Sequence, residues 1–189
     1  MRVISGKAKG MRLASVPGKS TRPITDRVKE ALFNILGPWV IGKTVLDLFG
    51  GTGAVGIEAL SRGASHVHFL DINYRAYKII RQNLQQTRLD SGAIVQKKDA
   101  FSFLREEKEN QFDLIYVAPP QYKDIWLKAM QALDENPGLL DNDGIIIVQI
   151  HPKEYLKSAV FNHFQSYDER SYGDTLLIFY EQISAPMNR

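Results

Sequence analysis

The chain has 189 residues, 44% of them hydrophobic and 24% charged, and its formal net charge is +3. This composition is typical of a single globular domain and excludes a disordered or collagen-like chain. The absence of cysteine excludes disulfides, thiolate metal sites and a cysteine nucleophile. The apolar runs are far shorter than the roughly 20 residues of a membrane helix, and the N-terminus lacks the apolar stretch of a signal peptide. We therefore expect a cytoplasmic protein that contacts no membrane and binds no metal, and its oligomeric state stays unknown.

Positive charge is concentrated at the N-terminus. Residues 1–30 contain eight Lys or Arg and two acidic residues, a net charge of +6, which leaves −3 for the other 159 residues. A basic segment beside a mildly acidic body indicates an anionic polymer as partner, because neutralising phosphates releases counterions. A solvated basic surface is the alternative. The candidate RNA-binding residues are Lys7, Lys9, Arg12, Arg22 and Arg27.

The first twenty residues predict a β-hairpin. Apolar residues at 3–4 and 11–13 flank a turn at 6–10 that contains two glycines, which permit the backbone angles of a tight turn. We divide the chain into a basic hairpin arm with its loop, residues 1–24, and one structural unit, residues 25–189.

A helix is expected after this arm. Thr25 is the expected N-cap, Asp26 lies in the first turn, and Gly37-Pro38 ends the helix. Its apolar residues recur at helical spacing, and the inward face is expected to carry Val28, Leu32, Ile35 and Leu36.

From residue 44 onward, strands alternate with helices. This pattern predicts parallel βαβ units and a layered α/β sheet, in which ligands bind beyond the carboxyl ends of the strands. Near the C-terminus, two extended segments around a glycine turn predict an antiparallel hairpin at the sheet edge. The fold class is thus α/β and Rossmann-like, with a mostly parallel twisted sheet. The expected strands are 44–49, 66–70, 93–96, 112–117, 144–150, 163–169 and 175–182, and the expected helices after the first are 54–62, 74–86, 100–107 and 125–133.

A glycine-rich loop follows the first expected strand of the sheet. Gly51, Gly53 and Gly56 form G-x-G-x-x-G between a strand and a helix, a pattern that binds nucleotides through close backbone approach and the helix N-terminus. Asp71 follows Gly51 by twenty residues, at the end of the next strand, where a carboxylate can accept both ribose hydroxyls. A tight turn with an ordinary surface acid is the alternative.

Two further acids bear on the ligand. The glycine pattern alone does not choose between NAD and S-adenosylmethionine. Asp47 is aimed at the same crevice, where it would repel a pyrophosphate and attract the cationic amino group of S-adenosylmethionine. Asp99 suits an adenine amino group, and it is an equally good N-cap for a helix that starts at Ala100.

The loop after the fourth expected strand of the sheet contains two consecutive prolines. Pro119 and Pro120 fix the backbone and lack N–H groups, so the carbonyls of Ala118 and Pro119 can be presented rigidly to a ligand. An aromatic ring here can stack on a base. Such a loop suits an exocyclic amine as methyl acceptor; a rigid connector with a core tyrosine is the alternative. The candidate catalytic residues are Ala118, Pro119, Pro120, Gln121 and Tyr122.

Several longer motifs are more selective than the glycine pattern. They are RVISG at 2–6, TRPITDRVKEALFN at 21–34, VLDLFGGTG at 45–53, EALSRGA at 58–64, DA at 99–100, PP at 119–120 and YGDT at 172–175. On these motifs, the chain resembles the bacterial small-subunit ribosomal-RNA guanine-N2 methyltransferases, the RsmD-like group of S-adenosylmethionine enzymes, over nearly its full length.

The resemblance implies an S-adenosylmethionine methyltransferase fold and methyl transfer to the 2-amino group of one guanine in ribosomal RNA or the small ribosomal subunit. It implies that the segment 21–27 lies near the pocket and the RNA, where Arg22 and Arg27 hold phosphate or orient the base; helix capping and salt bridging are their alternative roles. A base inside a duplex is unreachable, so the target must be unpaired or flipped. The implied cofactor contacts are Asp47, Phe49, Gly51, Gly53, Asp71, Ile72, Asp99 and Ala100.

The chain departs from the family pattern at two positions. Ala118 stands where relatives carry Asp or Asn before the prolines, with the aromatic shifted by one position, and Gln149 stands where relatives often carry Glu. Backbone carbonyls, Gln121 or Gln149 would then act as acceptors, or the accepted nucleotide differs, or catalysis is lost. The competing functions are a catalytically weakened RNA-binding member of the same fold and an NAD(P)-linked oxidoreductase.

Overall fold

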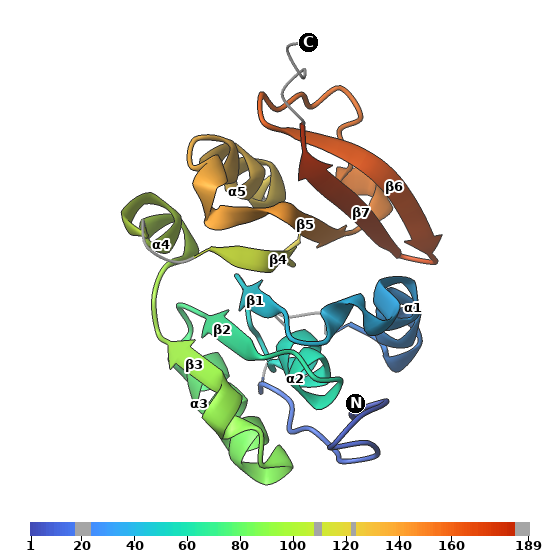
Figure 1. Cartoon of the computed structure of the whole chain (residues 1–189), viewed down its shortest axis with the longest axis vertical. Coiled ribbons are helices and arrows are strands. Elements are labelled where there is room, and N and C mark those ends of the chain that lie inside the picture. The colour runs from blue at the N-terminus through green and yellow to red at the C-terminus, as the bar shows by residue number, and fades with distance from the viewer. Residues whose placement is uncertain (18–23, 108–110, 122–123, 184–189) are drawn as a thin grey trace.

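The structure, a computed structural model, describes residues 1–17, 24–107, 111–121 and 124–183. Its centre is one seven-stranded sheet with the strand order β3-β2-β1-β4-β5-β7-β6, and Figure 1 shows helices on both of its faces. The strands are β1 (Thr44–Asp47), β2 (His66–Leu70), β3 (Ala93–Gln96), β4 (Phe112–Val117), β5 (Leu140–Ile150), β6 (Phe164–Tyr172) and β7 (Thr175–Gln182). The α-helices are α1 (Asp26–Leu36), α2 (Ala54–Ser61), α3 (Tyr74–Thr87), α4 (Ala100–Glu106) and α5 (Ile125–Asp134).

The strand directions confirm the predicted α/β class. Strands β1 to β5 pair in parallel, β7 pairs antiparallel with β5, and β6 completes the hairpin at the sheet edge. Gly173, with φ of 60°, provides the turn between β6 and β7. The strands that follow β1 extend the sheet on one side, and those that follow β4 extend it on the other. The crevice expected for a ligand therefore lies at this switch point, between the carboxyl ends of β1 and β4.

The sheet separates two apolar cores. One core lies under α1, α2 and α3 and includes Val45, Phe69 and Leu114 of the strands. The other lies under α4 and α5 and includes Leu46 and Ile115. Neighbouring residues of β1 thus point to opposite cores, as the alternation of side chains along a strand requires.

Helix α1 begins and ends where the sequence predicts. The Thr25 hydroxyl accepts a hydrogen bond from the Val28 N–H at 3.3 Å, and Gly37 ends the helix with φ of 54°. The expected inward face is wrong at one residue, because Ile35 is 42% exposed whereas Val28, Leu32 and Leu36 are buried.

Several boundaries differ from the sequence-based expectation. Strand β6 spans Phe164–Tyr172 and not 163–169, and the C-terminal ends of α2, α3, α4 and α5 each differ by one residue. Strand β1 ends at Asp47 and not at Phe49, because the backbone turns there into the glycine loop. Strand β5 begins at Leu140 and not at Gly144. Residues 141–143 have the composition of a turn, yet an irregularity in the pairing with β4 between Phe112 and Leu114 accommodates them in the sheet.

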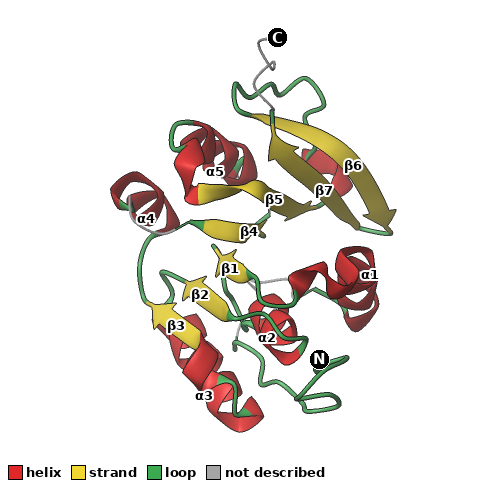
Figure 2. Ribbon diagram, in the orientation of Figure 1, coloured by secondary structure: helices red, strands yellow, loops and turns green. Residues whose placement is uncertain are grey.

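The N-terminal segment, residues 1–17, has the course of a hairpin but forms one isolated bridge, Arg2 with Arg12, in place of two strands. The Val3 N–H donates to Met11 O at 2.9 Å, and the Gly10 N–H donates to Val3 O at 2.8 Å. Val3, Ala8 and Leu13 are buried in the core under α2 and α3. Figure 2 shows this segment as a loop beside α2. The division of the chain after residue 24 stays a prediction.

Helix α2 holds the N-terminal segment through polar groups. The Glu58 carboxylate accepts the backbone N–H groups of Ile4 at 2.7 Å and Ser5 at 3.0 Å. The Ser61 hydroxyl donates to Ser5 O at 2.5 Å and accepts from the Ala8 N–H at 2.9 Å. Gly6 is required here, because a Cβ on it would lie 1.8 Å from Ser61 O. The motifs RVISG (2–6) and EALSRGA (58–64) are therefore joined by hydrogen bonds in the folded chain.

Candidate functional site

The glycine loop lies between β1 and α2 and is fixed from the neighbouring strand. Gly51 has φ of 56°, a conformation that side chains disfavour, and its N–H donates to Asp71 Oδ2 at 2.9 Å. Gly56 lets α2 approach β2 closely, since a Cβ there would lie 2.3 Å from the Phe69 ring. Gly53 is the N-cap of α2, with φ of 76°. The strand–loop–helix context required by the glycine pattern is thus present.

Asp47, the last residue of β1, has an almost completely buried carboxyl group, with 2% of the residue exposed. Burial, together with the charge of Asp71, raises the pKa of this carboxyl to about 8, against a hydrogen bond from the Gly56 backbone that lowers it. In the described part of the chain the Asp47 carboxyl has no ion-pair partner. A cationic ligand group would restore its charge. The residues therefore fit the amino group of S-adenosylmethionine and disfavour a pyrophosphate.

Asp71 lies at the carboxyl end of β2, beside the glycine loop. Its two oxygens accept N–H groups of Gly51 at 2.9 Å and Asn73 at 2.7 Å. Burial raises the pKa of this carboxyl, while both hydrogen bonds lower it. A carboxylate oxygen accepts more than one hydrogen bond, so Asp71 retains capacity for ribose hydroxyls. Ile72, the next residue, is 69% exposed and offers an apolar surface at the same edge.

Asp99 has the capping role that the sequence allowed. Its Oδ1 accepts the Ser102 N–H at 2.9 Å at the start of α4. The side chain of Ala100 is buried in the α4–α5 core, which leaves its backbone for a ligand contact. Phe49 is half-buried against the same core. The adenine contact proposed for Asp99 and Ala100 stays a prediction.

Tyr116 and Gln149 lie on the Asp47 side of the sheet. Tyr116 is the register partner of Asp47, and its hydroxyl donates a hydrogen bond to the Gln149 side-chain oxygen. Burial, with the charge of Asp47, raises the pKa of Tyr116 well above its usual value, so the phenol remains a donor. Tyr116 therefore occupies one of the two lone pairs of the Gln149 side-chain oxygen. Sequence reasoning missed Tyr116, because only the pairing of β1 with β4 reveals it.

The proline loop follows β4 at the same edge of the sheet. Ala118, Pro119 and Gln121 are half-buried and Pro120 is exposed. Ala118 packs against the core under α1 to α3. Tyr122, the expected stacking residue, lies outside the described residues.

Asn83 of α3 holds the glycine loop through a hydrogen bond to its backbone. Sequence reasoning did not identify this residue. It is completely buried, its Nδ2 donates to Thr52 O at 2.9 Å, and its side chain exchanges two hydrogen bonds with the Ala14 backbone, at 2.8 and 3.1 Å. An asparagine in the apolar stripe of a helix was the available signal, since a buried amide requires partners. Asn83 thus joins the N-terminal segment to the ligand loop.

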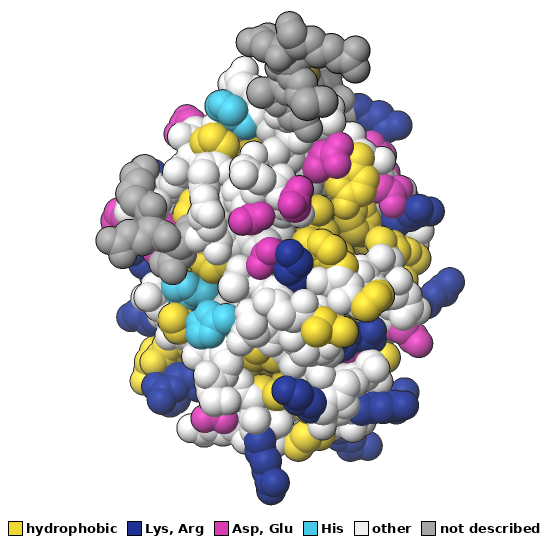
Figure 3. Space-filling view, in the orientation of Figure 1, with side chains coloured by type: hydrophobic (Ala, Val, Ile, Leu, Met, Phe, Trp, Pro, Cys, Tyr) yellow, Lys and Arg dark blue, Asp and Glu magenta, His cyan; other side chains and the backbone are white. Residues whose placement is uncertain are grey.

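Four of the five predicted RNA-binding residues are described, and Arg22 lies outside the described residues. Lys7, Lys9, Arg12 and Arg27 are all exposed. In Figure 3, Lys and Arg side chains are frequent in the lower half of the view, over the N-terminal segment, α1 and α3, whereas Asp and Glu are more frequent toward β5, β6 and β7.

Two absences concern the described residues alone. No helix among them is both long and apolar enough to cross a membrane. Within those same ranges, no group of three or more His, Cys, Asp or Glu side chains is arranged to hold a metal ion.

Comparisons with known proteins agree with this geometry. The chain is 39% identical over 184 residues to the Bacillus subtilis protein named "Putative rRNA methyltransferase YlbH", and the match covers 96% of this chain and 99% of that one. It is 30% identical over 162 residues to ribosomal RNA small subunit methyltransferase D of Escherichia coli strain K12, with 86% and 80% covered. The solved structure described as "Putative methyltransferase yhhF from Escherichia coli" matches with a TM-score of 0.84 and 30% identity, over 96% of this chain and 97% of that one. These similarities confirm the methyltransferase fold.

The family model described as "Conserved hypothetical protein 95" matches residues 1–181, which include the glycine loop, the proline loop, β6 and all of β7 except Gln182. The chain therefore belongs to the conserved hypothetical protein 95 family, the RsmD-like group whose motifs its sequence carries.

Proposed function

We propose that the chain transfers a methyl group from S-adenosylmethionine to the exocyclic 2-amino group of a guanine in small-subunit ribosomal RNA. The observation that carries this proposal is the buried Asp47 carboxyl beside the glycine loop, with its pKa of about 8. The names of the B. subtilis and E. coli relatives support ribosomal RNA as the substrate. When bound, S-adenosylmethionine supplies an electrophilic methyl group on a cationic sulfur.

The residues of the crevice each have a binding task in this proposal. Asp47 pairs with the amino group of the cofactor, and Asp71 accepts hydrogen bonds from the ribose hydroxyls. Gly51 and Gly53 bring the backbone close to the ligand, and Ile72 covers the adenine. Asn83 keeps the loop in place through Thr52 O. No described residue is needed as a metal ligand.

The proline loop holds the target amine. The backbone carbonyls of Ala118 and Pro119 accept the N–H groups of the exocyclic amine, which directs its lone pair toward the methyl group. Two consecutive prolines fix these carbonyls before the substrate arrives. As the N–C bond forms, the bond between the methyl carbon and sulfur breaks, and its electron pair stays on the sulfur of the departing thioether. The amine then loses one proton to solvent, so the chemistry requires no general base with a shifted pKa.

A catalytically weakened, RNA-binding protein is the second candidate. Two observations favour it: Ala118 has no side-chain acceptor, and the Gln149 oxygen already accepts one hydrogen bond, from the Tyr116 hydroxyl. The two candidates share the cofactor crevice and the RNA surface, and they differ in the rate of methyl transfer.

Transfer of tritium from methyl-labelled S-adenosylmethionine to unmodified small-subunit ribosomal RNA, free and assembled into subunits, tests the proposal. Nucleoside analysis by mass spectrometry should identify N2-methylguanosine. Label in another nucleoside would refute the guanine assignment. RNA binding without label would favour the second candidate. Isothermal titration with both cofactors provides an independent check, since binding of NAD without binding of S-adenosylmethionine would overturn both.

A further inference from the structure

Helix α3 and strand β3 form a second basic segment of the chain. Residues 74–98 contain six Lys or Arg and one Asp, a net charge of +5. Because residues 1–30 carry +6 and the whole chain +3, the other 134 residues carry −8. Positive charge is thus concentrated in two segments, and the second is not explained by the N-terminal segment or by the cofactor contacts. An excess of this kind attracts an anionic partner.

Two stacked tyrosines lie at the start of α3, in the basic segment 74–98. The ring centroids of Tyr74 and Tyr77 are 6.1 Å apart with 17° between the ring planes, and Tyr74 is 57% exposed. Lys78 Nζ lies 5.3 Å and Lys97 Nζ 5.8 Å from the Tyr74 centroid. The cations thus surround an exposed aromatic ring, which is the combination that single-stranded nucleic-acid sites use.

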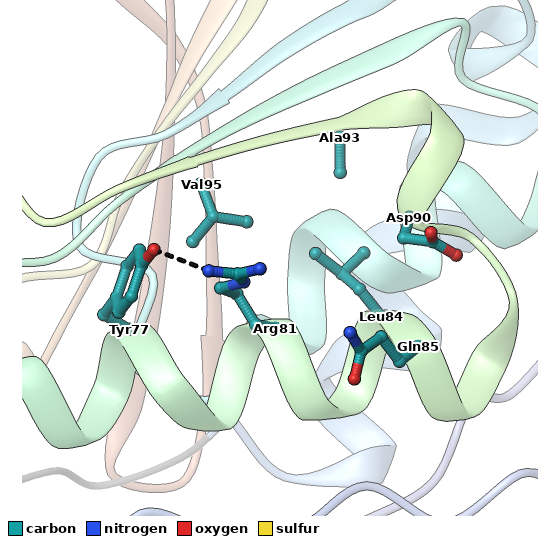
Figure 4. A pocket seen from close by; sticks show the side chains of 7 residues that line it. All are labelled: Tyr77, Arg81, Leu84, Gln85, Asp90, Ala93 and Val95. Atoms are coloured by element: carbon teal, nitrogen blue, oxygen red, sulfur yellow. Dashed lines mark hydrogen bonds between the residues drawn. The ribbon is translucent and has the colours of Figure 1, made fainter.

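A cavity of about 320 Å³ continues this surface between α3 and β3. Figure 4 shows the Tyr77 and Arg81 side chains pointing toward β3, where Val95 and Ala93 form the opposite wall. Arg81 Nη1 donates to the Tyr77 hydroxyl at 2.9 Å, and the Arg81 guanidinium lies 5.7 Å from the Tyr77 ring. The guanidinium is therefore held beside a hollow of mixed lining, in which Gln85 and Asp90 lie with Leu84.

We propose that Tyr74, Tyr77, Lys78, Arg81 and Lys97, named here the α3 surface, bind an unpaired stretch of the RNA substrate. One base stacks on the exposed Tyr74 ring, and the neighbouring phosphates contact Lys78, Lys97 and Arg81. Tyr74 follows Asp71 by three residues, so RNA held here lies near the ribose-binding end of the proposed cofactor site. The inference rests on the proposed function, because it takes ribosomal RNA as the ligand.

Equilibrium binding to unmodified small-subunit ribosomal RNA, free and assembled into subunits, tests the α3 surface. Tyr74→Ala should weaken RNA binding roughly 5- to 150-fold, the range for one lost base–aromatic stack, and Tyr74→Phe should retain most of the affinity. Lys78→Gln with Lys97→Gln should reduce the salt dependence of binding. The matched controls are Tyr167→Ala, a tyrosine 49% exposed on β6, and Lys153→Gln with Lys157→Gln; these should bind RNA like the unmodified chain.

The outcomes separate this inference from the proposed function. Affinity of Tyr74→Ala equal to that of Tyr167→Ala, with S-adenosylmethionine binding intact in both, would overturn the α3 surface whether or not methyl transfer occurs. Selective loss of RNA affinity in Tyr74→Ala supports the α3 surface even in a chain that transfers no methyl group, a result that would refute the proposed function alone. Thermal melting of each variant verifies that the fold persists.

Discussion

Lys29 and Glu58 form an ion pair in which neither side chain is exposed, with Lys29 Nζ 3.5 Å from Glu58 Oε2. Lys29 Nζ also donates to Arg2 O at 2.5 Å, and Arg62 Nε donates to Glu58 Oε1 at 2.7 Å. Burial lowers the pKa of Lys29, while the charge of Glu58 raises it. One buried carboxylate therefore joins α1, α2 and the N-terminal segment.

Glu58→Gln should destabilise the fold by about 3–5 kcal/mol, because it leaves the Lys29 charge buried without its partner. The double variant Lys29→Met with Glu58→Gln should recover part of this loss, since it removes the fully buried Lys29 charge. The Arg62 side chain, 15% exposed, still loses its carboxylate partner. Urea unfolding measures both free energies. A loss below about 1 kcal/mol for Glu58→Gln would show that the buried pair contributes little.

Gly6→Ala should displace the N-terminal segment, because the new Cβ would meet Ser61 O at 1.8 Å. Gly10→Ala is the matched control: Gly10 has the same φ of 83°, and its Cβ would have no neighbour within 4 Å. The difference in free energy of unfolding between the two variants isolates the clash and is expected to be about 1–3 kcal/mol. Equal free energies of unfolding for the two variants would mean that the N-terminal segment moves away from Ser61 without loss of stability.

The sequence predicted most strands of the sheet well, because each is a short apolar run that can be recognised without knowledge of its neighbours in space. Strands β2, β3, β4 and β7 occur at the predicted residues. Hydropathy failed at Ile35, whose exposure depends on what α1 meets in three dimensions. The two strands expected in the N-terminal segment are absent because its backbone groups bond to Glu58 and Ser61, far along the chain.

The candidate site was predictable where a motif fixes the backbone locally. The glycine loop and the position of Asp71 follow from spacing, and the structure brings Gly51 and Asp71 together. Asn83 and Tyr116 required tertiary information: one contacts the loop from a helix, and the other reaches Gln149 only through strand register.

Asp47→Asn should stabilise the protein while abolishing S-adenosylmethionine binding. The folded pKa of about 8 exceeds the ordinary value of 3.8. The folded chain therefore keeps a proton that the unfolded chain releases, and stability falls as pH rises between these values. Replacing the buried carboxyl should add on the order of 2–4 kcal/mol to the free energy of unfolding near neutral pH.

Unfolding in urea at several pH values and isothermal titration of the cofactor check these expectations for Asp47→Asn. In the unmodified chain, cofactor affinity should rise as pH increases toward about 8, because a cation binds the ionised carboxyl. Cofactor binding by Asp47→Asn at unmodified affinity would refute the role of Asp47.

Ala118→Asp should raise methyl-transfer turnover, by up to about 100-fold if one pre-positioned acceptor limits the rate. Ala118→Val is the control, since it adds volume without an acceptor. Single-turnover rates at saturating RNA separate chemistry from binding. An unchanged rate in Ala118→Asp would indicate that the backbone carbonyls suffice or that another step limits turnover.

Lys7→Ala with Lys9→Ala should weaken RNA binding and flatten its salt dependence. Both residues are exposed on the N-terminal segment. Each lost phosphate contact should reduce the slope of log K against log salt by about 0.7–0.9. Filter binding at several salt concentrations measures the slope, and a slope equal to that of the unmodified chain would exclude these lysines from the RNA interface.

The hydrogen bonds between Asn83 and Ala14 have a consequence for how the chain folds during its synthesis. The N-terminal segment reaches its final place only after α2 and α3 exist, and α3 ends at Thr87. Until then Val3 and Leu13 lack their buried surroundings, and the carbonyl of Thr52 lacks its donor. Residues 1–17 can therefore reach their final contacts only after the chain through Thr87 is available, and the Asn83 amide that binds them also binds the carbonyl of Thr52.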